Sequence, residues 1–276
     1  MTNVQKEEIR QAINNYCHAK GLSKNEFATQ AEVSSATLSN IEHNKWDNIA
    51  DGIWRKLHIK VKSFASKVFS TQDYSAIVKL CDISRKKHYM CGLIADTGMG
   101  KTTALDAHTF SKSTYKVTFD KTLRPKQFFA ALLKEMGVAF DGNIHAMVSL
   151  IADELNEQEN PLIIIDEAGK LTHTMILYLQ VLRDKTAKNC GIVLAGMPYF
   201  KENLIKLANK HKEGYAEFYR RINIWHQLEG LTREEIEFVC NTYDITDTAK
   251  IWELRKLKRF GDLMNEIIRI ETINEN

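Results

Sequence analysis

The segment Asp96-Thr-Gly-Met-Gly-Lys-Thr-Thr103 constrains the fold of this 276-residue chain more than any other feature. An apolar run from Tyr89 to Ala95 predicts a strand in front of it, and a helical pattern begins at Lys101. A strand, a glycine-rich turn and a helix in this order form a P-loop, in which backbone amides and the helix N-terminus hold phosphate groups. The sequence therefore predicts an α/β domain with a nucleotide site at the end of its first strand.

The residues of this loop have separate expected roles. Gly98 and Gly100 let the backbone approach phosphate oxygens, because no Cβ blocks the approach. Lys101 is expected to reach the β- and γ-phosphates, and Thr102 to ligate Mg²⁺. The first glycine of the usual motif is Ala95 here, a conservative departure. The predicted ATP-binding residues of the loop are Thr97, Gly98, Met99, Gly100, Lys101, Thr102 and Thr103.

A second apolar run, Leu162 to Ile165, ends in the acid pair Asp166 and Glu167. Asp166 is expected to hold the metal through a water molecule, and Glu167 to orient and polarise an attacking water. With the P-loop, the pair predicts hydrolysis of ATP to ADP and phosphate, or ATP-gated binding. A small-molecule kinase is the competing interpretation of a P-loop. The acid pair argues against it, because a kinase excludes water rather than activating it.

Strand and helix patterns alternate from about residue 88 to residue 230, which predicts a parallel sheet flanked by helices. The expected strands are 89–95, 115–119, 162–166, 191–196 and 222–228. The expected helices that follow the P-loop helix are 126–136, 144–158, 174–184 and 199–210. Residues 231–276 are expected to form a small helical lid that opens with a capping box at Thr232 and Glu235. The predicted domains are 1–62, 63–230 and 231–276.

An all-α, repressor-like helix-turn-helix domain is expected within residues 1–62. Gly21 is expected to end a first helix, and Ser23 and Glu26 form a capping box for the next. A turn over 31–34 then places Ser34 at the N-cap of a helix over 35–43. Short polar side chains on this helix can meet phosphates and base edges of double-stranded DNA; they include Ser35, Thr37 and Asn40. The helix is not strongly basic and carries Glu42, so a protein–protein role stays open.

Composition limits the class of protein less than these motifs do. Lysine and arginine number 38 against 35 acids, and a net charge of +3 is too small to indicate a nucleic-acid-binding protein. Local clusters would have to provide any DNA contact. The five cysteines contain no C-x-x-C pair, and we expect buried thiols in a reducing compartment. A polar N-terminus and short apolar runs indicate a cytoplasmic protein without a membrane span.

The order of the motifs resembles one group of AAA+ ATPases. The P-loop, IIIDEAGKL, GIVLAGMPYF and FYRRINIW follow one another, as in the AAA+ target-DNA activator ATPases of transposition. This is the family of the phage Mu B protein and, more distantly, of the helper ATPases of Tn7-type elements and insertion sequences. The likeness covers the chain to about residue 270, including the repressor-like N-terminus. It implies ATP-bound oligomers or helical filaments on target DNA, largely without sequence preference, that recruit or activate a transposase.

The resemblance also implies roles for particular residues. Arg221 matches an arginine that a neighbouring subunit contributes to the γ-phosphate, with Arg220 as its rival. The loop after the second strand would line a DNA channel; its cations are Lys121, Arg124 and Lys126. Lys170 and His173 are a second candidate DNA set. The basic residues 85–87 are expected to lie in a solvated linker that could contact DNA.

Two positions depart from the family pattern. A polar sensor residue usually ends the fourth strand, and Met197 takes its place. The lid arginine expected after Gly261 is replaced by Met264. Both changes favour a slow ATPase that is stimulated by DNA or a partner. A helicase-loader-type AAA+ ATPase, and a nucleotide-gated DNA-binding regulator with little hydrolysis, remain alternatives.

Overall fold

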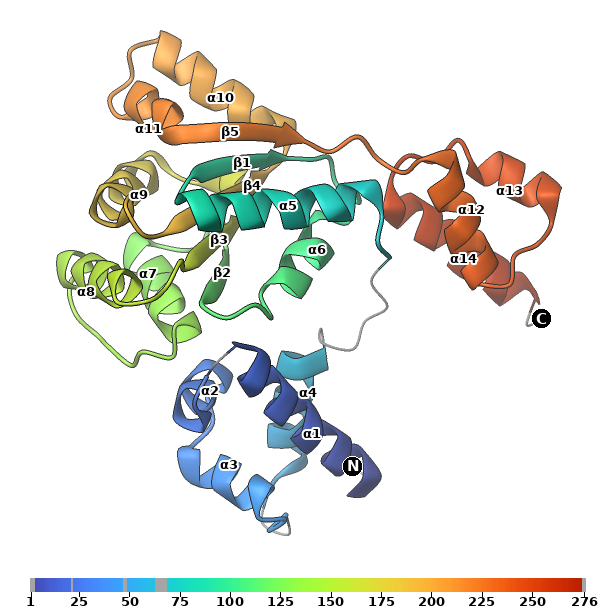
Figure 1. The fold of residues 1–276 in the computed structure, drawn as a ribbon, viewed down its shortest axis with the longest axis horizontal. Helices are drawn as coiled ribbons and strands as arrows, with labels where there is room; N and C mark the ends of the chain where they lie inside the picture. Colours follow the sequence, from blue (N-terminus) through green and yellow to red (C-terminus); the bar gives the residue numbers. More distant parts are fainter. Residues whose placement is uncertain (1–2, 21, 47–48, 63–68, 275–276) are drawn as a thin grey trace.

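A five-stranded parallel sheet forms the centre of the molecule (Figure 1). The computed structural model describes residues 3–20, 22–46, 49–62 and 69–274. Neighbouring strands follow the order β2-β3-β4-β1-β5. The strands are β1 Met90–Ile94, β2 Thr114–Thr118, β3 Leu162–Asp166, β4 Gly191–Gly196 and β5 Ile222–Gln227. Each agrees with its predicted range to within one residue at either end, so the predicted parallel sheet is confirmed.

Helices cover both faces of this sheet. Alternate residues of a strand point to opposite faces, and in β3 Ile163 and Ile165 join one apolar cluster whereas Ile164 joins another. Because both faces are buried, the inner strands are continuous apolar runs. The first face carries α7 Pro125–Glu135, α8 Ile144–Asn156, α9 His173–Thr186, α10 Pro198–Asn209 and α11 Tyr215–Arg221. The second carries α5 Gln72–Lys87 and α6 Lys101–His108.

The sequence patterns missed α5, and the expectation of a solvated linker over 85–87 is wrong. The helix buries Ile77, Leu80 and Cys81 against the sheet. The Arg85 guanidinium at its end donates to the carbonyl oxygens of Lys112, at 3.0 Å, and Asn160, at 2.8 Å. Burial lowers the pKa of Arg85. This arginine therefore ties together the segments that precede β2 and β3 and is not a free cation for DNA.

Four N-terminal helices enclose a separate apolar core that includes Phe27, Trp54 and Leu57. They are α1 Asn3–Lys20, α2 Lys24–Ala31, α3 Ser35–Glu42 and α4 Asp51–Lys62. The predicted capping box before α2 and the predicted serine cap of α3 are both present. Gly21 lies outside the described residues, and so does the segment 63–68 at the predicted domain boundary. The division into domains therefore stays a prediction.

The N-terminal helices contact the central domain at the end of α7. The side-chain amide of Gln30 donates to the carbonyl oxygen of Glu135, and Lys60 lies 2.9 Å from the Glu135 carboxylate. Glu32 forms ion pairs with Lys134 of α7 and with Lys56. These contacts fix α2 against α7, whereas half of the residues of α3 are exposed.

Three C-terminal helices form another unit, which lies beside the sheet in Figure 1. They are α12 Arg233–Thr242, α13 Thr248–Leu254 and α14 Phe260–Asn274, and Ile236, Val239 and Leu263 lie in their shared core. The predicted capping box at Thr232 and Glu235 is present. In the described part of the chain, no helix combines the length and apolar character needed to cross a bilayer.

All five cysteines are buried and unpaired, as predicted. Burial raises the pKa of Cys81 and of Cys190 to about 12. These thiols stay protonated at neutral pH, so they pack as small apolar groups.

Candidate nucleotide site

The P-loop connects β1 to α6 in a conformation that requires its glycines. Gly98 and Gly100 have φ angles of 81° and 80°, in the left-handed region that other residues rarely adopt. Gly100 is the N-cap of α6, so the free amides of that helix face the loop. Lys101 is 6% exposed, and its ammonium lies 3.5 Å from the carbonyl oxygen of Ala95. A buried cation at a helix N-terminus favours an anionic group such as phosphate.

The acid pair lies beside this loop, because β1 and β3 are parallel and end at the same edge of the sheet, with β4 between them. The Thr102 hydroxyl donates to Asp166 Oδ2 at 3.0 Å, and the Glu167 N–H donates to Asp166 Oδ1 at 2.9 Å. Asp166 is 1% exposed. Hydroxyl and carboxylate oxygens are ligands that suit Mg²⁺. The described residues contain no cluster of three or more metal-ligating side chains, so an ion here would need phosphate and water oxygens as well.

Sequence reasoning missed a lysine beside the acid pair. Lys116 on β2 places its ammonium 3.2 Å from Asp166 Oδ2 and 2.5 Å from Asp106 Oδ1. Its side chain is 9% exposed. A charged residue inside an apolar strand was the available signal, but its partner became clear only when β2 paired with β3. Lys116 compensates part of the charge that Asp166 carries into the core.

Glu167 has a lysine partner that was predicted to bind DNA. The Glu167 carboxylate lies 3.1 Å from the Lys170 ammonium, and the backbone of Glu167 is left-handed, with φ of 59°. A non-glycine residue in this conformation often marks a functional site. His173, from the same predicted DNA set, packs edge-on against Tyr215 at 5.4 Å between ring centroids. The structure therefore places Lys170 beside the predicted catalytic carboxylate.

The two methionines at sensor positions have different surroundings. Met197 directly follows β4, as predicted, and its sulfur lies 3.7 Å from the Thr97 hydroxyl that donates to it. A thioether is a weak acceptor without a proton to donate, so it orients water poorly. Met264 packs against the core of the C-terminal helices. Neither position provides a polar group toward the P-loop.

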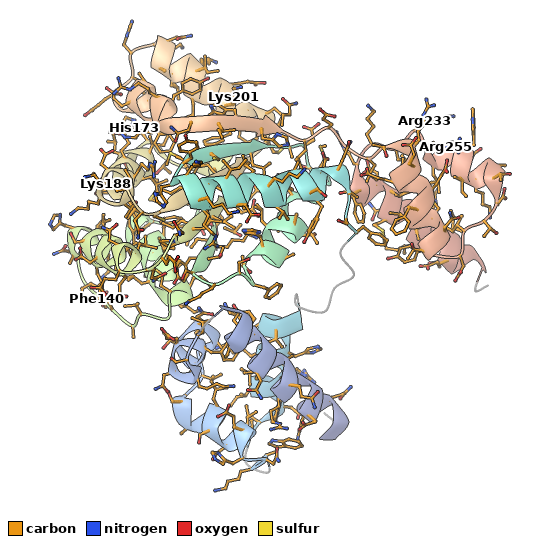
Figure 2. All side chains as sticks on the ribbon, in the orientation of Figure 1. Phe140, His173, Lys188, Lys201, Arg233 and Arg255 are labelled. Atoms are coloured by element: carbon orange, nitrogen blue, oxygen red, sulfur yellow. The ribbon has the colours of Figure 1, made fainter. Side chains whose placement is uncertain are left out.

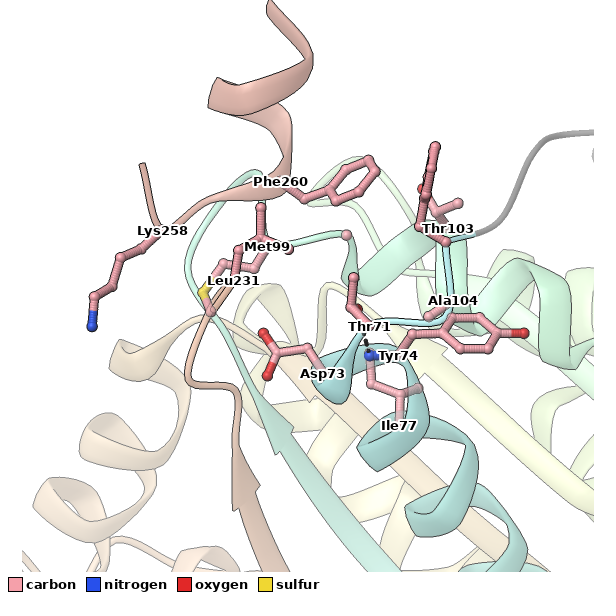
Figure 3. Close-up of a pocket in the computed structure, with 12 residues that line it drawn as sticks. Thr71, Asp73, Tyr74, Ile77, Met99, Thr103, Ala104, Leu231, Lys258 and Phe260 are labelled. Carbon is pink, nitrogen blue, oxygen red and sulfur yellow. Dashed lines mark hydrogen bonds between the residues drawn. The ribbon is translucent and has the colours of Figure 1, made fainter. Parts of the chain in front are cut away.

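An apolar pocket adjoins the phosphate loop (Figure 3). It shares Met99, Gly100, Thr103 and Phe260 with the groove around the loop. The remaining lining includes Phe69, Thr71, Tyr74, Ile77, Leu231 and Lys258. The sequence patterns missed this pocket, because its wall combines the unpredicted α5 with segments more than 150 residues away along the chain.

Asp73 in the pocket wall has a structural role. Its carboxylate accepts hydrogen bonds from the N–H groups of Glu229, at 3.0 Å, and Gly230, at 2.9 Å. Burial raises the pKa of Asp73 against the effect of these two donors. The carboxylate thus ties the start of α5 to the segment that leads into α12.

The two candidate trans arginines differ in their contacts. Arg221 forms a bidentate pair with Asp184, at 2.9 and 2.7 Å, and donates to the carbonyl oxygen of Glu217. Arg220 is exposed, and no ion pair involves it among the described residues. Both precede β5 and therefore lie at the opposite edge of the sheet from the P-loop, about 20 Å away for a strand of this length. Neither arginine can reach the nucleotide site of its own chain.

The predicted DNA-binding residues are partly available. Lys121 and Arg124 are exposed in the loop after β2, whereas Lys126 pairs with Asp141 at 2.7 Å. On α3, Ser35 and Asn40 are exposed. Thr37 is half-buried, and its hydroxyl lies 2.7 Å from that of Ser34. Lys170 and the loop after β2 lie at the same end of the sheet, because β2 and β3 are parallel neighbours.

Comparison with protein families finds a likeness for the central part of the chain. The model of the family described as AAA domain matches residues 84–204, which contain the P-loop, the first four strands and the acid pair. This part of the chain therefore resembles an AAA domain, and the expected parallel sheet flanked by helices is confirmed by the structure. No curated protein matches the chain.

Among solved structures, the chain is similar to replication initiator DnaA bound to AMPPCP and single-stranded DNA, with a TM-score of 0.48 and 15% identity. It is also similar to a structure described as a DNA replication initiation factor, with a TM-score of 0.48 and 13% identity. Each match covers 76% of this chain and 64% of the other. The resemblance to transposition ATPases stays a prediction from the sequence.

Proposed function

We propose that this chain is an ATP-dependent DNA-binding ATPase that assembles on target DNA and recruits or activates a transposase. The observation that carries the ATPase part is the contact of the P-loop with the acid pair. Thr102 of the loop and Asp166 of β3 meet at 3.0 Å, with the Lys101 ammonium buried in the loop. This arrangement fits a Mg²⁺–ATP complex, with Thr102 and Asp166 holding the ion and Lys101 facing the β- and γ-phosphates.

The purine base would enter the adjoining apolar pocket, whose volume of about 50 Å³ would have to widen on binding. Tyr74 and Phe260 offer aromatic surface, and Ile77, Met99 and Leu231 exclude water. A concave and mostly apolar wall of this kind is typical of sites for planar ligands. The pocket joins α5, the P-loop and the C-terminal helices, so a bound nucleotide would touch all three at once. We infer that nucleotide binding holds the C-terminal helices against the AAA domain, as a lid does.

Hydrolysis would depend on Glu167. The Glu167 carboxylate would accept a proton from the attacking water. Lys101 would neutralise charge on the phosphates, and a bound Mg²⁺ would supply the same chemistry. The Lys170 ammonium pairs with this carboxylate, and the Met197 thioether orients water poorly. These two features support slow basal turnover. They also favour the second candidate function, a nucleotide-gated DNA-binding regulator with little hydrolysis.

DNA binding and assembly would use surfaces away from the P-loop. Lys121 and Arg124 are exposed in the loop after β2 and would bind phosphates without reading sequence. The exposed face of α3 would add contacts if the N-terminal helices act as a helix-turn-helix. For assembly, the exposed Arg220 is the better trans candidate, because Asp184 already binds Arg221.

The first experiment measures binding to random-sequence duplex by anisotropy and electron microscopy, in ATP, in ADP and without nucleotide. ATP-dependent coating of DNA is expected for the wild type, and Lys101→Ala should abolish it. Normal DNA binding by that variant would disprove the ATP switch. Stimulation of a transposase would then separate the proposed role from helicase loading. Nucleotide-independent binding of one discrete site would favour a regulator acting through the N-terminal helices.

A further inference from the structure

A basic groove lies where the chain leaves β5 and enters α12, outside the nucleotide site. Its volume is about 440 Å³. Arg233, Arg255, Lys256 and Lys258 contribute four positive charges to its lining, and Glu229 contributes the single acid. Figure 2 shows Arg233 and Arg255 close together on the C-terminal helices. A concave surface with this excess of positive charge attracts ligands that carry several negative charges.

Three of the four cations form no ion pair with a carboxylate in the described part of the chain, and two of these three also lack an aromatic partner. Arg255 pairs with Glu237, and the Lys256 ammonium lies 4.6 Å from the centre of the Trp252 ring. Arg233 and Lys258 are exposed and form no ion pair in the described part of the chain. Their charges are therefore available to a ligand without breaking an existing contact.

An exposed tryptophan lies beside one of these cations, Lys256. Trp252 on α13 is 60% exposed, although large aromatic side chains are usually buried. An aromatic ring beside a row of cations is typical of surfaces that bind nucleic acid, where bases stack on the ring and phosphates meet the cations. An acidic protein segment would use the cations but would leave the aromatic ring unexplained. The combination favours a nucleic acid.

We propose that this groove binds the phosphodiester backbone of a DNA strand, with Trp252 positioned to contact a base. The proposal deepens the proposed DNA binding and rests on it. The contacts would be mainly with phosphates, so they would lack sequence preference and would weaken with salt.

The groove shares a wall with the pocket for the purine base. Leu231 and Lys258 line both cavities, and the Leu231 N–H donates to the Lys258 carbonyl oxygen at 2.9 Å. Figure 3 shows the Lys258 side chain extending away from the base pocket. DNA that binds the Lys258 ammonium would thus hold the backbone that borders the nucleotide. Binding of ATP and of DNA should then strengthen each other by the same factor.

The test is the double variant Arg233→Glu/Lys256→Glu in the full chain. Neither residue lines the base pocket, and Arg233 is the exposed first residue of α12, where an acid interacts well with the helix dipole. With ATP present, the affinity for fluorescent single-stranded and duplex DNA should fall by about tenfold or more. The dependence of log affinity on log salt should become shallower by about 2. Affinity for a fluorescent ATP analogue, measured without DNA, should stay unchanged.

The matched control is Lys185→Glu/Lys188→Glu, which makes the same change of charge at exposed positions near the start of β4. Figure 2 shows Lys188 on the opposite side of the molecule from Arg233. The affinity of this control for DNA should stay close to that of the wild type. DNA should change the tryptophan fluorescence of the wild type, and Trp252→Phe should remove this change. Comparing the size of the change with single-stranded and with duplex DNA shows which form provides the contacted base.

Three results would overturn the assignment. If Arg233→Glu/Lys256→Glu bound DNA as tightly as the wild type, the groove would not be a DNA site, and the proposed function would still stand. A wild type that binds no DNA under any nucleotide condition would remove both. If Arg233→Glu/Lys256→Glu bound DNA normally but no longer bound a fluorescent polyglutamate peptide that the wild type binds, the groove would be assigned to an acidic protein partner instead.

Discussion

The backbone N–H of Gly261 donates a hydrogen bond to the carbonyl oxygen of Gly98 at 2.7 Å. Gly98 is the middle of the P-loop, and Gly261 lies in the first turn of α14. A Cβ on Gly261 would lie 3.2 Å from both the Cα and the carbonyl oxygen of Gly98. The C-terminal helices therefore dock on the phosphate loop through two backbones, at a distance that leaves little room for a side chain.

This contact predicts the effect of Gly261→Val. The branched side chain should push α14 away from the loop, and Phe260 with it, so affinity for ATP should fall by about tenfold, measured by calorimetry. Gly52→Val is the matched control, because a Cβ at Gly52 meets no atom within 4 Å. Unchanged ATP affinity in Gly261→Val would show that the C-terminal helices do not close the nucleotide site.

Glu167→Gln tests the role of the second acid. The amide cannot accept a proton from water, so hydrolysis should fall by a factor of about 10² to 10⁴ while ATP binding persists. The DNA-bound assembly should dissociate more slowly in ATP than that of the wild type. A variant that hydrolyses ATP at the normal rate, or that leaves DNA faster, would rule out Glu167 as the group that positions water.

The contacts of the two arginines predict different losses on substitution. Arg220→Ala should leave ATP binding by the isolated chain unchanged, and reduce DNA-stimulated hydrolysis by about a thousandfold, because a trans arginine stabilises transition-state charge. Arg221→Ala should lower the free energy of unfolding by about 1 kcal/mol through loss of its partly exposed Asp184 pair. If Arg221→Ala lost DNA-stimulated hydrolysis and assembly while Arg220→Ala kept both, Arg221 would be the trans residue.

A pH effect is expected where the N-terminal helices meet α7. The ammonium of Lys134, followed by that of Lys56, lowers the pKa of Glu32 from 4.5 to about 2. A lowered pKa in the folded protein stabilises it above pH 4.5, and this contribution disappears as the pH falls toward 2. Because Glu32 is largely exposed, the effect should stay below about 1 kcal/mol.

Glu32→Gln should therefore reduce the pH dependence of unfolding between pH 4.5 and 2, measured by urea denaturation. Glu42→Gln is a comparable control, since its surface pair with Lys24 lies within the N-terminal helices. A wild-type slope in Glu32→Gln would show that the contact with Lys134 does not stabilise the fold.

The sequence by itself predicted the five strands and placed the P-loop and the acid pair at the ends of two of them. The glycines at positions 98 and 100 reflect backbone sterics, and the apolar run before Asp166 reflects the burial of a whole strand. Both are local properties of the sequence. The caps at Ser23, Ser34 and Thr232 are local as well, since each serine or threonine satisfies donors within three residues.

Tertiary structure decided which side chains meet. Lys116 and Asp166 are 50 positions apart in sequence, and only strand pairing brings them together. The pairing of Arg221 with Asp184, the base pocket and the basic groove likewise join segments that are distant along the chain. No periodicity encodes such contacts, because they depend on how the helices pack on the sheet. Local sequence thus specified the residues of the P-loop, whereas packing specified which charged side chains form ion pairs and which stay exposed.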